Sequence, residues 1–437
     1  MNKKTARRAR RLWLHYGVFW SGAIAVGLLA VLYAWLIDFG YGLFRVGFDR
    51  HPWLVLIVTP AVGALCVALT RRFFRGTEGS GIPQVVATLH GDTATLGARL
   101  LTLRLLAGKV LVSFVAILGG FTIGREGPTV QVGAALMFSL RHFYPERVQR
   151  LAGVALQRRL VLAGAAAGLS AAFNTPLAGI VFAIEELTRS FESRASGVLI
   201  TAIIFAGVIA LGLNGNYTYF GTIDTGVHFS RLLALAAVLT GVVYGIAGGL
   251  FSWLLLNTRR WLPAPLRELQ SHRPVLFGAL CGLAVAALGL ASSGHTFGSG
   301  YAEARALLEE HTQLSVLYPL VKMASMIGSY LPGIPGGIFA PTLSIGAGIG
   351  NVMHLVFVHT PLPVLIALAM VGYLAGVTQS PITAFVIVIE MINGHALVIS
   401  LMATALIAAR VSRFFAPPLY DALSTRFGHA TPPHTAR

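Results

Sequence analysis

Runs of apolar residues recur along almost the whole chain, and they limit the folds open to it more than any other feature of the sequence. Runs long enough, or nearly long enough, to span a bilayer cover residues 13–37, 53–69, 198–213, 232–256, 275–291 and 396–409. Charged residues make up 11% of the 437 positions, against about 25% in soluble domains. The sequence therefore predicts an all-α polytopic membrane protein.

The formal net charge of +17 is placed beside the apolar runs. Basic residues that precede the first run or cluster in loops are Lys3, Lys4, Arg7, Arg8, Arg10, Arg11, Arg71, Arg72, Arg75, Arg141, Arg147, Arg150, Arg158, Arg159, Arg259 and Arg260. Such juxtamembrane charge sets topology and attracts anionic lipid headgroups. We therefore expect residues 1–12 to be a basic cytoplasmic N-terminus, with membrane lipids as partners and no nucleic acid.

A glutamate between two glycines stands where one long apolar run ends and the next begins. The stretch is Gly124-Arg125-Glu126-Gly127-Pro128. A charge at membrane depth costs at least ~2.5–3.5 kcal/mol, so a chain that retains one usually has a use for it. The glycines let the backbone leave the helix, and Pro128 suits the first turn of a new one. This pattern predicts a membrane-buried helix N-terminus that binds an anion, with Glu126 as a titratable competitor.

Two halves of the chain share this pattern. Residues 337–347 align without gaps on 124–134, 213 positions earlier, and residues 380–390 repeat 175–185 at an offset of 205. The helical pieces after these motifs are short and interrupted by glycine and proline, which is typical of discontinuous helices around a midplane site. We predict a first membrane repeat over 13–215, a second over 216–420, and a short cytoplasmic tail at 421–437.

Four motifs resemble the CLC family of chloride channels and proton-coupled chloride transporters. They are GSGIP at 79–83, GREGP at 124–128, GIFAP at 337–341 and PPLY at 417–420, in the order of the family and over nearly the whole chain. The resemblance implies two inverted-topology repeats of discontinuous, tilted helices. It also implies a homodimer with one ion path per subunit. From the sequence alone, the halves would fit a parallel or an inverted arrangement.

The resemblance also assigns site residues. Glu126 would be the external gate, whose carboxylate competes with chloride and leaves when protonated. Chloride would be bound by the Ser80 hydroxyl, the Tyr420 phenol and the amides of Ile338 and Phe339, with Gly81 and Gly337 beside them. The glycines, arginine and proline around Glu126 (Gly124, Arg125, Gly127 and Pro128) would support the gate. Taken singly, GSGIP also fits a surface turn, Tyr420 an interfacial tyrosine, and each acid a helix end that faces headgroups.

The pair Glu185-Glu186 distinguishes an exchanger from a channel. By resemblance, Glu186 matches the position that takes protons from the cytoplasm, with Glu185 as its neighbour, and this favours chloride/proton antiport. A passive chloride channel, gated by voltage or pH, is the alternative. Lys109 matches a buried lysine of the family, but Gln84, Val85 and Val86 stand where its usual acidic partner would be. Without that partner, Lys109 should lose its charge or find backbone carbonyls.

Other classes of function find little support. There is no HExxH, no GxSxG and no His/Cys cluster with ligand spacing, so we expect neither an enzyme nor a metal or other cofactor. A purely structural membrane protein would leave Glu126 unexplained. The transported ions would be chloride and protons, and the expected location is a bacterial inner membrane with both termini cytoplasmic.

Overall fold

The computed structural model describes residues 16–428, apart from 145, 189–196, 216–219, 222–230, 310–313, 393 and 395–396. The expected N-terminal segment 1–12 and the end of the tail lie outside these residues. Helices of the first half are α2 (Val18–Arg50), α3 (Val55–Phe73), α4 (Ile82–His90), α5 (Thr93–Leu100), α6 (Leu103–Leu118), α7 (Glu126–Ser139), α8 (Glu146–Phe173), α9 (Pro176–Phe182) and α10 (Gly197–Asn214). A π-helical turn, η4 (Ala183–Thr188), follows α9.

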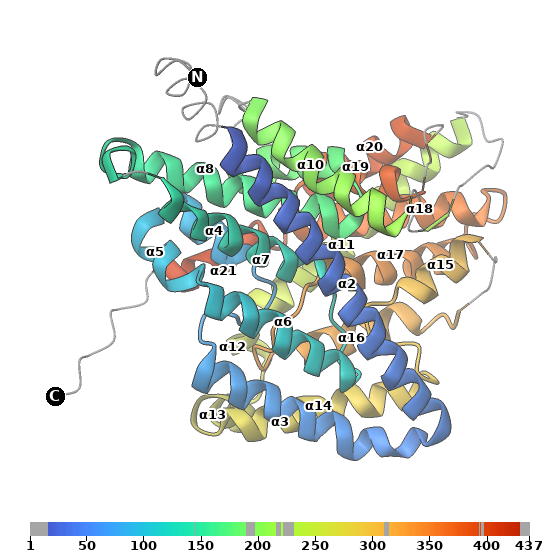
Figure 1. Cartoon of the computed structure of the whole chain (residues 1–437). Coiled ribbons are helices and arrows are strands. Elements are labelled where there is room, and N and C mark those ends of the chain that lie inside the picture. The colour runs from blue at the N-terminus through green and yellow to red at the C-terminus, as the bar shows by residue number, and fades with distance from the viewer. Residues whose placement is uncertain are drawn as a thin grey trace.

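The second half is also built from helices (Figure 1). Its helices are α11 (Arg231–Leu256), α12 (Thr258–Trp261), α13 (Ala264–His272), α14 (Pro274–Ala291), α15 (Tyr301–Glu309), α16 (Tyr318–Tyr330), α17 (Phe339–Met353), α18 (Leu362–Thr378), α19 (Pro381–Ile392), α20 (Val398–Ser412) and α21 (Leu419–Gly428). No strand occurs among the described residues, which confirms the all-helical prediction. The tail expected from residue 421 begins inside α21.

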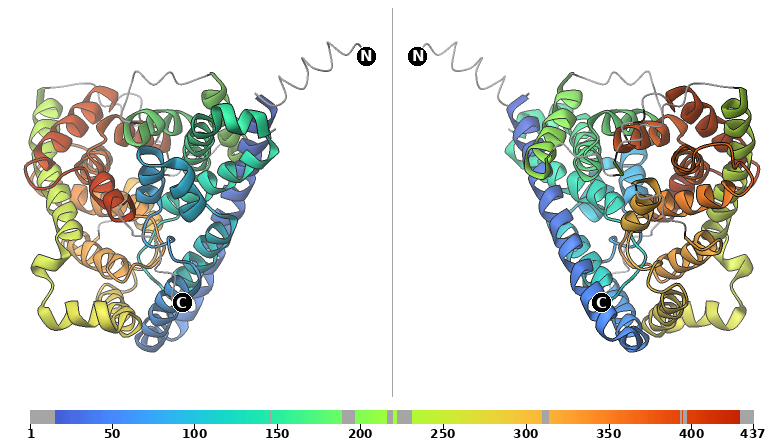
Figure 2. Two further views of the ribbon diagram at one scale, coloured as in Figure 1. Left: turned by 90° about the vertical axis from the view of Figure 1, so that its left-hand side faces the viewer. Right: turned by 90° about the vertical axis from the view of Figure 1, so that its right-hand side faces the viewer.

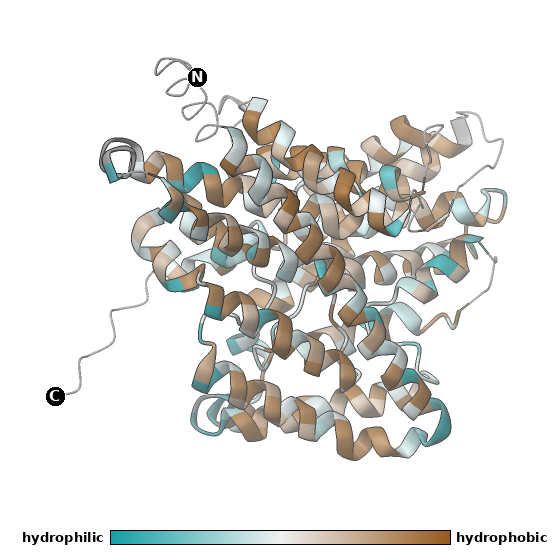
Figure 3. Cartoon of the chain, viewed as in Figure 1, coloured by the Kyte–Doolittle hydropathy of each residue, from teal (hydrophilic) through white to brown (hydrophobic). Residues whose placement is uncertain are grey.

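Apolar helices form the outside of the molecule. Within the described ranges, five helices are long and apolar enough to cross a membrane, or six if the bent pair α5–α6 is one span. Large apolar side chains such as Leu32, Trp35 and Phe39 on α2 are more than half exposed, and the ribbon of the outer helices is largely brown, the colour of hydrophobic residues (Figure 3). Residues 398–409 of the apolar run expected at 396–409 lie in α20, which at 15 residues is shorter than the candidate spans.

The same chain reversal starts the short helices α9 and α19. Asn174 and Gln379 adopt left-handed backbone (φ 58° and 62°) just before Pro176 and Pro381 open these helices. A left-handed residue ends one helix, and proline, with its fixed φ, starts the next. Asn174 and Gln379 are 205 positions apart, so the sequence repeat is also a repeat of backbone conformation.

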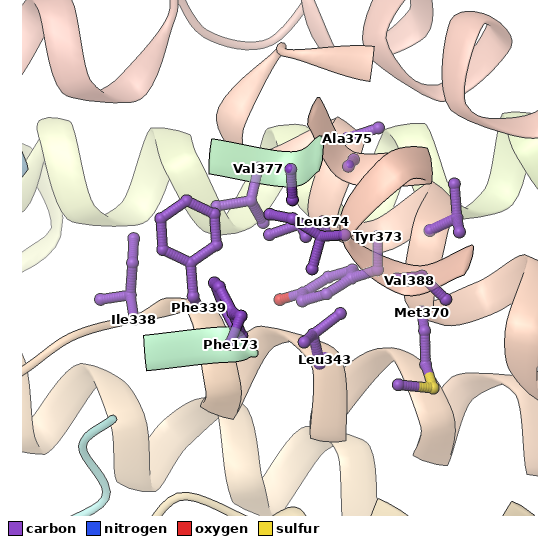
Figure 4. Close-up of a cluster of buried hydrophobic side chains, with 14 of the residues drawn as sticks. Phe173, Ile338, Phe339, Leu343, Met370, Tyr373, Leu374, Ala375, Val377 and Val388 are labelled. Atoms are coloured by element: carbon purple, nitrogen blue, oxygen red, sulfur yellow. The ribbon is translucent and has the colours of Figure 1, made fainter. Parts of the chain in front are cut away.

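Glycines let two helix pairs pack closely in equivalent places. A Cβ on Gly133 of α7 would lie 2.2 Å from the carbonyl oxygen of Gly164 on α8, and one on Gly346 of α17 would lie 2.8 Å from that of Ala369 on α18. The pairs α7–α8 and α17–α18 therefore correspond. Every residue of α18 is buried, and its side chains pack around Phe339 and Leu343 of α17 (Figure 4).

The arrangement of the halves places the starts of α7 and α17 in the interior. The helix α2 runs obliquely along one flank, while α3 and α14 lie side by side at one end (Figures 1 and 2). The short helices α4 and α21 pack against each other near the start of α7.

Candidate functional site

Two hydrogen bonds join the starts of α7 and α17. The amide of Gly124 donates to the carbonyl of Gly337 and the amide of Gly337 donates to that of Gly124, both at 2.7 Å, in an antiparallel bridge. A Cβ on Gly337 would lie 3.0 Å from the nitrogen of Gly127, so only glycine fits there without displacement. The bridge brings the N-terminal ends of both helices, with their positive partial charge, to one place.

Glu126 is the first residue of α7 and is fully buried. Its Oε1 accepts a 2.6 Å hydrogen bond from the hydroxyl of Tyr301, and its Oε2 lies beside Gly124. The backbone amides of Glu126 itself and of Ala340 in α17 face the carboxylate. The carboxylate thus lies where the two helix starts meet, a place that stabilises negative charge.

The side chain of Arg125 contacts α2 and the ring of Tyr301. Its Nη1 lies 2.7 Å from Asp38 Oδ2 and donates to the carbonyl of Ala34, both on α2, and its guanidinium stacks on the ring of Tyr301 at 5.9 Å. This side chain therefore ties the start of α7 to α2.

Ser80 and Tyr420 bring two buried hydroxyls together. Ser80 stands between Gly79 and Gly81, both in left-handed backbone (φ 64° and 100°), and a Cβ on Gly127 would lie 2.2 Å from Ser80 Oγ. The Ser80 and Tyr420 hydroxyls face each other. Neither has a hydrogen-bond partner within the described part of the chain. A buried polar group without a partner costs about 1–3 kcal/mol, which makes this pair of hydroxyls a candidate ligand site.

The start of α17 presents backbone amides toward the same region. Ile338 is the residue before α17 and Phe339 is its first, so their amides have no acceptor within the helix. The Phe339 ring lies 5.9 Å from the ring of Tyr420 and packs edge-on against Phe173. By contrast, the Gly337 amide is already used in the bridge to Gly124, so it is not available to an anion.

Lys109 has found backbone carbonyls. Its buried Nζ donates to the carbonyl oxygens of Thr77 at 2.8 Å and Gly79 at 2.7 Å. Of the two alternatives for this lysine, the one in which it reaches backbone carbonyls is confirmed. Lys109 thereby fixes the loop that carries Ser80.

Glu185 and Glu186 lie on the π-helical turn η4 and point to different partners. Glu186 is buried and accepts a hydrogen bond from the Ser380 hydroxyl. It is also close enough to Tyr420 to interact with it electrostatically. Glu185 instead accepts the amides of Ile382 and Thr383 at 3.1 and 2.6 Å. Single π-turns of this kind are frequent at functional sites.

The sequence analysis did not identify Tyr301 and Ser380, which contact Glu126 and Glu186 respectively. Ser380 precedes Pro381 in the second-half copy of the 175–185 motif, so the repeat already marked its position. Tyr301 follows Gly298-Ser299-Gly300, which repeats Gly79-Ser80-Gly81. That likeness was the available signal.

Solved structures with the same fold are known. One is the crystal structure of a slow cyanobacterial Cl−/H+ antiporter, with 24% identity, a TM-score of 0.77, and coverage of 94% of this chain and 97% of that one. A CLC-type fluoride/proton antiporter is similar at 20% identity, TM-score 0.76, covering 93% and 96%. A eukaryotic CLC transporter is similar at 22% identity, TM-score 0.73, covering 93% and 74%. At these identities the likeness shows the fold.

A family model covers most of the chain. The model described as voltage gated chloride channel matches residues 62–413, which include the Ser80, Glu126, Glu186 and Phe339 segments. This chain belongs to the voltage gated chloride channel family.

Proposed function

We propose that this protein exchanges chloride for protons across the membrane, with Glu126 as the external gate and Glu186 as the internal proton acceptor. One observation carries most of the proposal. The buried hydroxyls of Ser80 and Tyr420 face each other without a partner among the described residues, next to the helix start that carries Glu126. A small anion is the ligand that two hydroxyl donors and a helix N-terminus suit.

The donors at this site favour weak, reversible binding. Hydroxyls and the amides of Ile338 and Phe339 carry partial charge only, and Lys109 and Arg125 are engaged elsewhere. Transport requires an ion to leave as readily as it enters, which a full positive charge at the site would hinder.

Glu126 competes with the anion for the same helix starts. When it is ionised, its carboxylate gains from the amides that face it. When it is protonated, that attraction is lost and the site is free for chloride. Because chloride favours the protonated gate and protonation favours chloride, the two ions are linked as exchange requires.

In this proposal Glu186 supplies protons from the cytoplasmic side. Tyr420 interacts electrostatically with both Glu186 and Glu126, so it is near both acids. The Ser380 hydroxyl donates a hydrogen bond to Glu186 and holds its side chain in one orientation. The two antiporters among the similar structures support exchange over passive conduction.

A flux experiment tests this proposal. Purified protein is reconstituted into liposomes with a pH gradient, no chloride gradient and a potassium ionophore, and chloride and internal pH are recorded together. We expect the pH gradient to drive chloride uphill. Glu126→Gln should abolish proton movement while chloride still moves. Glu186→Gln should also abolish proton movement while chloride still moves, because protons are no longer accepted from the cytoplasmic side.

The exposed Glu268 on α13 provides the control, since Glu268→Gln should leave both fluxes unchanged. Chloride flux in the unaltered protein with no linked proton movement would support the alternative, a passive channel gated by voltage or pH. Absence of any chloride flux would contradict both.

The assembly and location belong to the same proposal. We propose a homodimer with one ion path in each subunit, in a bacterial inner membrane with both termini cytoplasmic, acting without a cofactor. Cross-linking in native membranes tests the dimer, and labelling of an N-terminal cysteine from each side tests the orientation.

A further inference from the structure

The loop that carries Ser80 has a copy in the second half of the chain. Residues 77–81 read Thr-Glu-Gly-Ser-Gly and residues 296–300 read Thr-Phe-Gly-Ser-Gly, 219 positions later. The backbone repeats as well, because φ is 64° at both Gly79 and Gly298, and 100° and 84° at Gly81 and Gly300. The chain therefore builds the same turn twice.

A buried lysine fixes each copy. Lys109 donates to two carbonyls of the first loop, as described above. Lys322 of α16 is also fully buried, and its Nζ donates to the carbonyls of Thr296, Phe297 and Gly298 at 3.0–3.2 Å. The two lysines are 213 positions apart, the offset of the helix-start motifs. Both loops are thus rigid platforms.

Each platform brings a hydroxyl to the start of α7. The first brings Ser80 against Gly127. The second leads directly into Tyr301, whose hydroxyl donates to Glu126 Oε1 at 2.6 Å. The ring of Tyr301 contacts Phe220, at 5.6 Å between centroids, and the guanidinium of Arg125, at 5.9 Å from the ring centroid.

We propose that Tyr301 is a positioning residue for the gate: its hydroxyl holds ionised Glu126 at the helix starts and sets the pH at which the gate opens. This inference rests on the proposed role of Glu126. A hydrogen bond to an ionised carboxylate is among the stronger ones in proteins, and it is lost when the side chain leaves. Opening therefore requires release of Tyr301 as well as protonation.

Other charged or ionisable groups also face Glu126. They are Arg125 beside it, Tyr33 from α2 and Tyr420 from α21, whereas α17 contributes the amide of Ala340. None of them would be altered by removal of the Tyr301 hydroxyl alone. Tyr301→Phe keeps the ring and its contacts with Phe220 and Arg125.

The test is the pH dependence of chloride flux in liposomes. Without the donor, the protonated gate is reached at higher pH, so Tyr301→Phe should shift the half-maximal pH upward by roughly 1–2 units. Fewer protons should move per chloride. The matched control is Tyr318→Phe, which removes a buried hydroxyl that bonds Ser344 instead, and it should not shift the profile. In a Glu126→Gln background, Tyr301→Phe should change nothing further.

An unchanged profile in Tyr301→Phe, or a uniform loss of flux at every pH, would overturn the inference, since the second result indicates a merely structural role. Monodisperse elution in detergent verifies that the variant folds. If the unaltered protein moved chloride without protons, the proposed exchange function would be wrong, and not the inference about Tyr301. The shift in the pH profile of chloride flux would still decide the role of Tyr301.

Discussion

Glu185 and Glu390 each cap the helix that the other half of the chain begins. Glu185 accepts the first amides of α19, from Ile382 and Thr383, and Glu390 on α19 accepts the amides of Leu177 and Ala178 on α9 at 3.2 and 2.8 Å. The two glutamates are 205 positions apart, so they are equivalent residues of the two repeats. The reciprocal caps join the halves near Glu186 and satisfy amides that lipid could not.

Removal of one cap should weaken the fold. Glu390→Ala leaves two α9 amides without acceptors, and hydrogen bonds to charged groups are worth about 1.5–3 kcal/mol each. We expect the unfolding temperature in detergent to fall by several degrees, with Glu185→Ala showing a similar loss. Glu268→Ala on the exposed face of α13 serves as the control. Equal unfolding temperatures for all three variants would show that the caps contribute nothing.

Tyr420→Phe should separate stability from anion binding. In chloride-free buffer the variant should unfold at a higher temperature, because it no longer buries a hydroxyl without a partner. Its chloride affinity, measured by calorimetry, should fall several-fold or more. Tyr244→Phe on α11 is the matched control: it also removes a buried hydroxyl that has no hydrogen-bond partner among the described residues, but one outside the assigned site, so chloride affinity should not change. A Tyr420→Phe protein that binds chloride normally would contradict the assigned site.

The two buried lysines should have separate effects. Lys109→Met releases the loop of Ser80, so chloride affinity should fall about tenfold, the equivalent of ~1.4 kcal/mol. Lys322→Met releases the loop before Tyr301, and it should alter the pH profile of flux while chloride affinity stays nearly constant. Calorimetry and flux assays on the monodisperse fraction distinguish the two. Identical changes in both variants would mean that the loops are not independent platforms.

Close packing at Gly133 should tolerate no side chain. Gly133→Ala places a methyl group 2.2 Å from the Gly164 carbonyl, and overpacking of this kind typically costs about 1–3 kcal/mol or more. The yield of folded protein and its unfolding temperature should both drop. Gly212→Ala on α10 is the control, because nothing lies within 4 Å of its added methyl group. There we expect a neutral or slightly stabilising effect, since alanine favours helix.

The helix starts were predictable because glycine and proline mark them directly. Gly124–Pro128 and Asn174–Pro176 each gave a break, a restart and a short apolar piece, and α7 and α9 follow that pattern. Side-chain partners were harder to predict. Tyr301 lies 175 positions from Glu126, and no local pattern specifies that its hydroxyl reaches the carboxylate.

The hydrogen-bond partners of backbone amides could not be predicted from the sequence either. Gly337 was expected beside the anion, yet its amide bonds Gly124 because the two halves approach in antiparallel orientation there. The sequence repeat predicted two equivalent halves but not how they face each other. Glu185 shows the same limit, since the acid next to the predicted proton acceptor turned out to cap a helix of the other half.

The two-bond bridge between Gly124 and Gly337 has a consequence for how such a path is built. Each repeat contributes one edge, so a single repeat cannot close the candidate site by itself. Sliding one copy along the other would break both bonds at once. The movement proposed for Glu126 needs no such break, because its side chain can leave the helix starts while both bonds between Gly124 and Gly337 stay intact.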